Sequence, residues 1–242
     1  MMRNTITFIV AVVAALAAAP SFAQDYAVIV AAPDRGAADR QTDQRRDPVK
    51  LLAFTGVRAG MHVLDMGAGG GYSTELMARA VGPDGKVYGQ DHEAGARAKE
   101  RFEARMKTDA MKNVVTLDRP FDDPMPDGVT NLDLITFFFF YHDTTYMAVD
   151  RAVMNKKLFA ALKPGGFLVI ADHSAKAGAG TSVGKTLHRI EESALKGEVE
   201  AAGFKLAGEG DWLRHPDDPR DERVFQPKTP VDEFVLKFQK PN

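Results

Sequence analysis

Apolar runs and amphipathic segments alternate along most of this chain. Short apolar runs that end in glycine, proline or aspartate predict strands, and longer segments with apolar residues three or four positions apart predict helices. The predicted strands are 61–65, 86–90, 114–117, 132–140, 167–171, 204–213 and 233–238, and the predicted helices are 48–55, 72–81, 93–108, 144–162 and 185–202. This alternation predicts one doubly wound α/β domain, whose seven-stranded, mostly parallel sheet carries an antiparallel strand pair at its C-terminal end.

The first 23 residues have the pattern of a secretory signal peptide. Arg3 precedes an apolar run over 6–19, Pro20 ends the run, and residues 21–23 form the small-x-small segment that signal peptidase reads. A run of about 14 residues is shorter than the roughly 20 that span a bilayer. We therefore expect cleavage after Ala23 and a periplasmic or secreted protein with no stable membrane anchor.

The predicted mature chain has two parts. Residues 24–47 are predicted to form a polar N-terminal arm. From about Asp34 to Asp47 the arm is rich in arginine and aspartate, has no apolar stripe and is expected at the surface. Pro48 then starts a helix that Gly56 ends. Residues 48–242 show no internal repeat and no linker, so we expect one domain over this range.

Composition excludes several kinds of site and partner. The 242 residues include no cysteine, which excludes disulfides, thiolate zinc sites, iron–sulfur clusters and a cysteine nucleophile. Lysine and arginine number 31 against 33 aspartates and glutamates, for a net charge of −2. Because no polybasic surface is indicated, a nucleic-acid partner is not expected.

A glycine-rich turn follows the first predicted strand of the sheet. Asp65 ends the strand, and Gly67, Gly69 and Gly71 follow at alternate positions. The dinucleotide fingerprint would need another glycine where Tyr72 stands, and no Gly-Lys-Ser/Thr segment follows as it would in a P-loop. Such a turn still lets a ligand approach the backbone closely, with a helix N-terminus facing it.

The segment Asp-x-Gly-x-Gly-x-Gly resembles motif I of the class I S-adenosylmethionine-dependent methyltransferases. Three further features match that family in order: Asp91 ends the second strand, Asp118 ends the third, and the Leu-Lys-Pro-Gly-Gly segment 162–166 enters the fifth. The resemblance extends from about Val49 to Pro241. It looks closest to a poorly characterised branch of predicted, often exported, methyltransferases.

The resemblance implies a Rossmann-like fold, methyltransferase activity and S-adenosylmethionine as the cofactor. It places Gly67 and Gly69 beside the methionine portion and the ribose. Asp91 would bind both ribose hydroxyls, since a carboxylate accepts such bonds well, and Asp118 would lie near the adenine amine. The cofactor-binding residues that it implies are Asp65, Gly67, Gly69, Gly71, Tyr72, Asp91 and Asp118.

The candidate acceptor site lies beyond the fourth and fifth strands, because ligands of open α/β sheets bind at the carboxyl ends of the strands. A histidine has a suitable pKa for a general base near neutral pH. We favour His142 over His173, because Tyr141 and Asp143 flank it. The predicted catalytic residues are His142, Asp143 and His173, and the predicted substrate contacts are Tyr141, Asp172, His188 and Arg189, of which the last two lie on helix 185–202.

Two other interpretations stay open. Ala171, Asp172 and His173 resemble the Ala-Asp-Asn segment that holds a divalent cation in metal-dependent catechol-type O-methyltransferases, but histidine replaces the asparagine. Asp143 also lies near, and not on, the position of the second acid in those enzymes, so no metal is assigned. The chain could instead bind S-adenosylmethionine or a nucleoside without turnover, although a pure binder has no need of polar groups at both strand ends.

The acceptor is expected to be a small molecule or a component of the cell envelope. The chain has no Asn-Pro-Pro-Tyr segment, which would indicate a nitrogen acceptor. Its absence favours methylation of oxygen or carbon.

Overall fold

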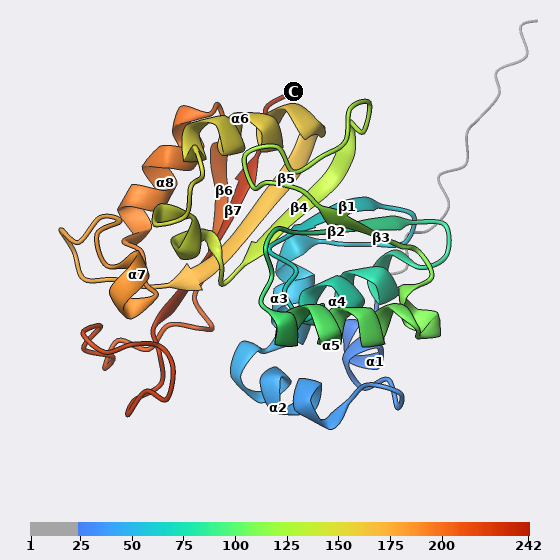
Figure 1. The fold of residues 1–242 in the computed structure, drawn as a ribbon, viewed down its shortest axis with the longest axis horizontal. Helices are drawn as coiled ribbons and strands as arrows, with labels where there is room; N and C mark the ends of the chain where they lie inside the picture. Colours follow the sequence, from blue (N-terminus) through green and yellow to red (C-terminus); the bar gives the residue numbers. More distant parts are fainter. Residues whose placement is uncertain (1–23) are drawn as a thin grey trace, which may run out of the picture.

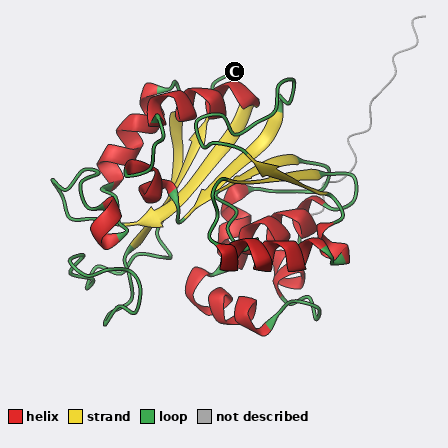
Figure 2. Ribbon diagram, in the orientation of Figure 1, coloured by secondary structure: helices red, strands yellow, loops and turns green. Residues whose placement is uncertain are grey.

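A seven-stranded sheet runs through the middle of the protein, with helices on both faces (Figures 1 and 2). The computed structural model describes residues 24–242, so the predicted signal peptide lies outside the described residues. The strands are β1 (His62–Met66), β2 (Lys86–Asp91), β3 (Val114–Asp118), β4 (Leu132–Phe138), β5 (Leu162–His173), β6 (Lys205–Gly210) and β7 (Glu233–Gln239). Their order is β3-β2-β1-β4-β5-β7-β6. Strands β1 to β5 are parallel, and β7 is antiparallel to β5 and β6, which confirms the predicted sheet.

Two hydrophobic cores separate the sheet from its two helical layers. The helices are α1 (Tyr26–Val30), α2 (Ala37–Arg46), α3 (Pro48–Thr55), α4 (Tyr72–Val81), α5 (Ala96–Met106), α6 (Arg151–Ala161), α7 (Gly184–Leu187) and α8 (Glu192–Ala201), with 3₁₀ helices η1 (Asp109–Met111) and η2 (Tyr141–Thr145). On one face, Leu76 of α4 shares a core with Val63 of β1. On the other, Leu158 of α6 and Leu195 of α8 share a core with Ile135 of β4. No helix within residues 24–242 is long and apolar enough to cross a bilayer.

Helices α3 and α4 have the predicted bounds. The Asp47 side chain accepts a hydrogen bond from the Lys50 amide at the start of α3, and Gly56, with a φ of 71°, ends the helix. Helix α4 begins at Tyr72, directly after the glycine turn. Its N-terminus therefore lies at the carboxyl edge of the parallel strands, where a ligand is expected.

The predicted helix over 144–162 is wrong in its first part, because α6 begins only at Arg151. Thr144 and Thr145, the expected caps, lie in η2 and donate hydrogen bonds to carbonyl oxygens three residues earlier. The side chain of Asp150 caps α6 in their place. At its other end α6 runs directly into β5, so the segment that was expected to close the helix begins the strand instead.

The predicted helix over 185–202 is also interrupted, since α7 and α8 are separate helices. Between them His188 adopts a left-handed conformation with a φ of 54°. Ile190 then forms an isolated parallel bridge to Ser174, just beyond β5. This extension of the sheet holds His188 near the carboxyl end of β5 and off any helix.

The N-terminal arm is helical: Tyr26, Ile29 and Val30 of α1 pack against one of the cores, and charged side chains attach α2 to the domain. Helix α2 lies beside α5 (Figure 1), and the Arg105 guanidinium of α5 donates hydrogen bonds both to Asp39 of α2 and to Glu75 of α4. Asp43 of α2 accepts a hydrogen bond of 2.6 Å from the Tyr72 hydroxyl. Asp39 is only 6% exposed. Ion pairs therefore hold α2 against the domain in place of the apolar stripe that it lacks.

Candidate active site

The three glycines of the turn between β1 and α4 have different roles. A Cβ atom on Gly67 would lie 2.9 Å from the Phe140 ring, and one on Gly71 would lie 2.9 Å from Cδ of Arg105. A Cβ atom on Gly69 would have no neighbour closer than 3.9 Å. Packing therefore requires glycine at 67 and 71, whereas Gly69 leaves open space in which a ligand can approach the backbone.

The buried side chain of Asp65 fixes the position of the residues around this turn by hydrogen bonds. Its side chain is fully buried and accepts hydrogen bonds from the hydroxyls of Ser73 (2.8 Å), Thr74 (2.7 Å) and Thr136 (2.6 Å). Burial raises the pKa of this carboxyl, and the three hydroxyls oppose the rise. These bonds join β1, β4 and the first turn of α4, so Asp65 acts on a ligand only through the shape of the turn.

Asp91, at the end of β2, lines a cavity of about 550 Å³ beside Gly69. Its two carboxylate oxygens accept hydrogen bonds of 2.8 Å, one from the Gly69 amide and one from the His92 amide. Each oxygen thus keeps a lone pair for a further donor. Burial raises the pKa of Asp91, the two amides oppose the rise, and the charge of Asp118 adds to it. Asp118 itself is exposed at the rim of the cavity.

The chemistry of this cavity fits the nucleoside part of S-adenosylmethionine. Phe102, Met106 and Leu117 supply an apolar wall, which suits a flat base. Asp91 supplies acceptors for a pair of hydroxyl groups. The open space at Gly69 lets the ligand reach the backbone at the start of α4. The predicted cofactor site therefore coincides with a cavity of suitable chemistry.

A second cavity, of about 350 Å³, lies beyond the carboxyl ends of β4 and β5. The predicted residues His142, Asp143, His173 and His188 all line it. The ring centroid of His142 lies 5.5 Å from that of His173 and 5.4 Å from that of His188. Nδ1 of His173 lies 2.9 Å from a carboxylate oxygen of Glu233 on β7. The structure thus brings three histidines together from η2, β5 and the loop after α7.

Arg46, at the end of α2, also lines this second cavity, and sequence patterns did not predict it. The guanidinium carbon lies 4.2 Å from the ring centroid of Phe139 and 5.5 Å from that of Tyr72. Burial lowers the pKa of Arg46 and Arg45 lowers it further, while Glu233, Tyr72 and Asp65 oppose them. No hydrogen-bonded carboxylate among residues 24–242 contributes to this balance. Arg46 therefore offers a positive charge between the glycine turn and the histidines.

His142 lies between two carboxylates. Its Nδ1 atom is 2.6 Å from Oδ1 of Asp172, and its Nε2 atom is 3.2 Å from Oδ1 of Asp143. Burial by itself would lower the pKa of His142, but Asp172 and Asp143 outweigh it and raise that pKa to about 10. The two carboxylates therefore favour the protonated form of His142 in the protein alone, and the ring acts as the predicted general base only after it loses the proton on Nε2.

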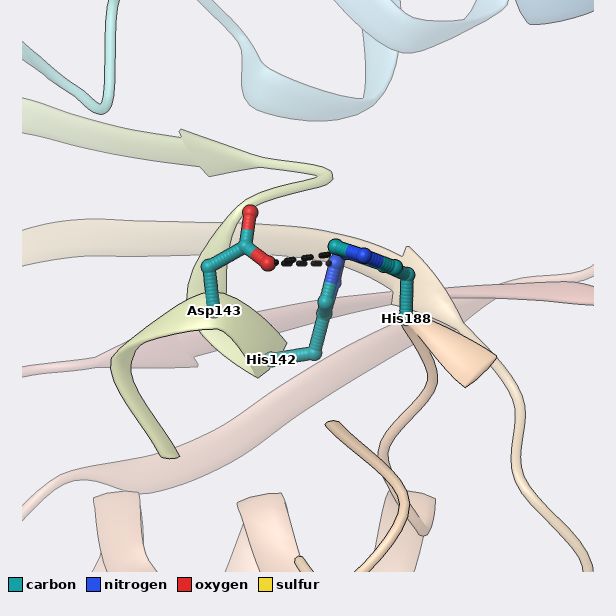
Figure 3. A group of neighbouring side chains, drawn as sticks. All are labelled: His142, Asp143 and His188. Carbon is teal, nitrogen blue, oxygen red and sulfur yellow. Dashed lines mark hydrogen bonds and ion pairs between the residues drawn. The ribbon is translucent and has the colours of Figure 1, made fainter. Parts of the chain in front are cut away.

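His188 and Asp143 converge on the same point as His142 (Figure 3). Nδ1 of His188 lies 3.0 Å from Oδ1 of Asp143, and the Tyr146 hydroxyl donates a hydrogen bond to that oxygen. His188 comes from the loop between α7 and α8, whereas the other two residues come from η2. The cluster therefore depends on the break in the predicted helix over 185–202.

Three predicted substrate contacts line neither cavity. The Tyr141 side chain is buried, and its hydroxyl donates a hydrogen bond to Glu198. Asp172 is fully buried behind η2. Arg189 is 1% exposed, and its Nη1 atom lies 2.7 Å from Asp218. In the protein alone these side chains make internal hydrogen bonds to Glu198, to the His142 amide and to Asp218.

The two cavities lie on either side of the glycine turn, at the carboxyl edge of one parallel sheet. This is the arrangement that open α/β sheets use to bind ligands. A family model described as a methyltransferase domain matches residues 58–211. The chain belongs to this family. Membership confirms the class I S-adenosylmethionine-dependent methyltransferase fold and the cofactor that the motifs predicted.

Relatives and solved structures support the same family. The chain is 31% identical over 131 residues to a demethylmenaquinone methyltransferase of Symbiobacterium thermophilum, covering 52% of this chain and 47% of the relative. It is 29% identical over 118 residues to a protein-L-isoaspartate O-methyltransferase of Triticum aestivum, covering 47% and 46%. The chain thus spans about half the length of the curated relatives it matches. An S-adenosylmethionine-dependent methyltransferase from Aquifex aeolicus shares the fold, with a TM-score of 0.61, 20% identity, and coverage of 90% of this chain and 99% of that one.

Proposed function

We propose that this protein is an S-adenosylmethionine-dependent methyltransferase whose acceptor is a small molecule bound in the second cavity. The observation that carries the proposal is the pair of cavities with unlike linings on the two sides of one glycine turn. The cavity at Asp91 has an apolar wall and hydroxyl acceptors. The cavity at His142 is lined by histidines and by charged groups of both signs. The first suits the cofactor, and the second suits a polar acceptor.

Different residues bind the different parts of the cofactor. When bound, S-adenosylmethionine supplies a methyl group on a sulfonium, so the transfer needs no redox chemistry. Asp91 accepts hydrogen bonds from the ribose hydroxyls, and Gly69 lets the cofactor lie against the backbone. Arg46 lies beyond the turn and supplies the positive charge for the carboxylate of the methionine portion. The chain then has to hold the acceptor in line with the methyl group.

The second cavity favours an oxygen nucleophile on a molecule of modest size. Its volume of about 350 Å³ lies at the low end of the range for small-molecule sites. Asp143 and Glu233 can accept hydrogen bonds from acceptor hydroxyls, and Arg45 can pair with an acidic group. The relatives act, by their names, on demethylmenaquinone in two cases and on a protein in another, so the small-molecule acceptor rests on the volume and lining of this cavity.

Release of S-adenosylhomocysteine tests this proposal. The purified protein is incubated with S-adenosylmethionine and a panel of small phenols, alcohols and carboxylic acids. The amount of S-adenosylhomocysteine formed and released is compared with that in acceptor-free samples. We expect acceptor-dependent release that Asp91→Ala abolishes and that Asp84→Ala, in an exposed turn far from both cavities, leaves unchanged. Binding of S-adenosylhomocysteine without release for any acceptor would favour a binding protein that has no turnover.

We also propose that the protein is exported. The support is the charged, apolar and small-x-small pattern of residues 1–23. The acceptor of an exported enzyme would be a periplasmic or envelope compound. Such an enzyme would also need a supply of S-adenosylmethionine outside the cytoplasm.

A further inference from the structure

Three donor atoms of the second cavity lie close enough together to share one metal ion. Nε2 of His142, Oδ1 of Asp143 and Nδ1 of His188 all lie within 4.8 Å of one another. Oδ1 of Asp143 is 3.2 Å from the first nitrogen and 3.0 Å from the second (Figure 3). Donors at bond lengths of roughly 2.0–2.1 Å in a tetrahedral zinc site lie about 3.3 Å apart. The two spacings to Oδ1 of Asp143 are close to this value, and the two nitrogens, which lie within 4.8 Å of each other, come from an η2 residue and a loop residue.

A buried carboxylate behind His142 sets the tautomer that a metal ligand needs. Asp172 is fully buried, and it accepts hydrogen bonds of 2.8 Å from the backbone amides of His142 and His173. Its orientation is thereby fixed, with Oδ1 2.6 Å from Nδ1 of His142. Nδ1 therefore carries a proton, and Nε2 is the nitrogen directed at Asp143. A ligating histidine that donates its other N–H to a carboxylate is the usual outer arrangement of a metal site.

The three donor atoms meet at one carboxylate oxygen. Oδ1 of Asp143 lies 3.2 Å from Nε2 of His142 and 3.0 Å from Nδ1 of His188. Protons on these two nitrogens would each donate to that oxygen separately, whereas one metal ion would take the place of both protons and join all three side chains. A metal ion at this point therefore competes with protons for the same three atoms.

The backbone conformation at His188 positions the third ligand. His188 ends α7 in the left-handed conformation, with a φ of 54°, and its amide donates to the Gly184 carbonyl as a helix cap. This conformation, together with the bridge between Ile190 and Ser174, holds the ring at the cavity. Nε2 of His188 has one contact, at 3.4 Å, with the exposed Arg223 side chain, which can move when that nitrogen carries the proton.

We propose that His142, Asp143 and His188 bind one divalent transition-metal ion, with zinc favoured by two nitrogen donors and one oxygen donor, and with an open position toward the second cavity. Three protein ligands and one open position are typical of catalytic zinc sites. The ligand set differs from the Asp172-centred site considered from sequence, because Asp172 lies behind His142 and cannot reach the ion. If the proposed function also holds, such an ion would polarise an acceptor oxygen beside the cofactor.

Metal titration tests the site without any reference to activity. The purified protein, made without a polyhistidine tag and stripped with a chelator, is titrated with Zn²⁺ by competition calorimetry and with Co²⁺ by visible absorption. We expect one ion per chain and the d–d absorption of four-coordinate Co²⁺. His188→Ala should lower the Zn²⁺ affinity by at least about 100-fold, since it removes one of three ligands. Asp172→Asn should lower it by about 10–100-fold, as an outer-sphere partner does.

The matched control is His215→Ala, since His215 lines the same cavity but lies outside the donor cluster. It should bind Zn²⁺ as tightly as the wild type. Circular dichroism melting checks that each variant folds, and His188, in a loop, is the ligand whose loss is least disruptive. Absence of stoichiometric Zn²⁺ in the wild type, or equal affinity in His188→Ala and His215→Ala, would overturn the proposal. Binding of S-adenosylhomocysteine by the same metal-free samples would show that the proposed function survives that result.

Discussion

The guanidinium of Arg46 lies over the ring of Phe139, with its carbon 4.2 Å from the ring centroid. Phe139 follows β4, and Arg46 ends a helix of the N-terminal arm, so the contact joins two distant parts of the chain. It places a positive charge beside the glycine turn, at one wall of the second cavity. A cation on an aromatic face is held in position without losing its charge. That position is the basis for assigning the cofactor carboxylate to Arg46.

Arg46→Met should weaken the binding of S-adenosylhomocysteine. Loss of a charge-assisted hydrogen bond costs about 1.5–3 kcal/mol, which corresponds to a rise in Kd of about 10–150-fold. Isothermal titration calorimetry measures the change. Arg40→Met, at an exposed position of the same helix, is the control and should leave Kd unchanged. Equal affinities in the two variants would assign the carboxylate to another group.

Asp91→Ala should weaken cofactor binding through the loss of both ribose hydrogen bonds. Two bonds to a charged group contribute roughly 3–6 kcal/mol, so Kd for S-adenosylhomocysteine should rise by at least about 100-fold. Adenine alone should bind the variant and the wild type equally, because its contacts lie elsewhere in the cavity. A parallel loss of adenine binding would indicate that the variant distorts the cavity.

The pH dependence of cofactor binding should follow the carboxyl of Asp91. Burial raises the pKa of this group in the free protein, and hydroxyl donors would stabilise its charged form in the complex. Binding therefore releases a proton at acidic pH, and affinity should fall as the pH drops through the raised pKa. The fall should begin at a higher pH than for an ordinary aspartate. Asp91→Asn should bind more weakly and lack this component of the pH profile.

Much of the fold could be predicted from the sequence because its signals are local. The bounds of α3 follow from Asp47, Pro48 and Gly56, and the strands follow from short apolar runs. The break at His188 could not be predicted, because residues 185–202 have helical spacing throughout. Only the pairing of Ile190 with Ser174 shows that the sheet takes part of this segment.

The site residues that directly follow strands were predicted from the sequence. The residues whose position depends on tertiary contacts were missed. His142 and His173 follow strand ends, so their proximity could be expected. Arg46 lies in a polar helix with no apolar stripe, and its place in the cavity depends on ion pairs such as that between Asp39 and Arg105. Arg189 was predicted to contact the substrate from a helix, yet it lies in the loop before α8, where its pairing with the distant Asp218 buries it.

Arg105→Met should destabilise the protein and loosen the arm. The Arg105 side chain is 19% exposed and pairs with Asp39 and Glu75, so its loss leaves two largely buried carboxylates without their shared partner. Breaking such a pair costs about 3–5 kcal/mol. Urea unfolding measures the free energy of unfolding, and limited proteolysis measures exposure of the arm. Arg97→Met, exposed on the same helix, should leave both unchanged.

The protein purified from its native host should begin at Gln24. The small-x-small segment at residues 21–23 is the expected cleavage site. N-terminal sequencing of the periplasmic or secreted fraction gives the answer directly. Protein that begins at Met1 in the cytoplasmic fraction would contradict export and leave the methyltransferase proposal untouched.

Calorimetry with S-adenosylhomocysteine tests the central claim most directly. The wild-type protein should bind one molecule of S-adenosylhomocysteine per chain. Gly69→Val should abolish binding, because its side chain would fill the open space at the turn, where the nearest atom to a Cβ position is 3.9 Å away, and because valine disfavours the φ of 52° found there. Circular dichroism must show that this variant keeps its sheet and melts cooperatively. Absence of binding by the wild type, or undiminished binding by folded Gly69→Val, would contradict the placement of the cofactor.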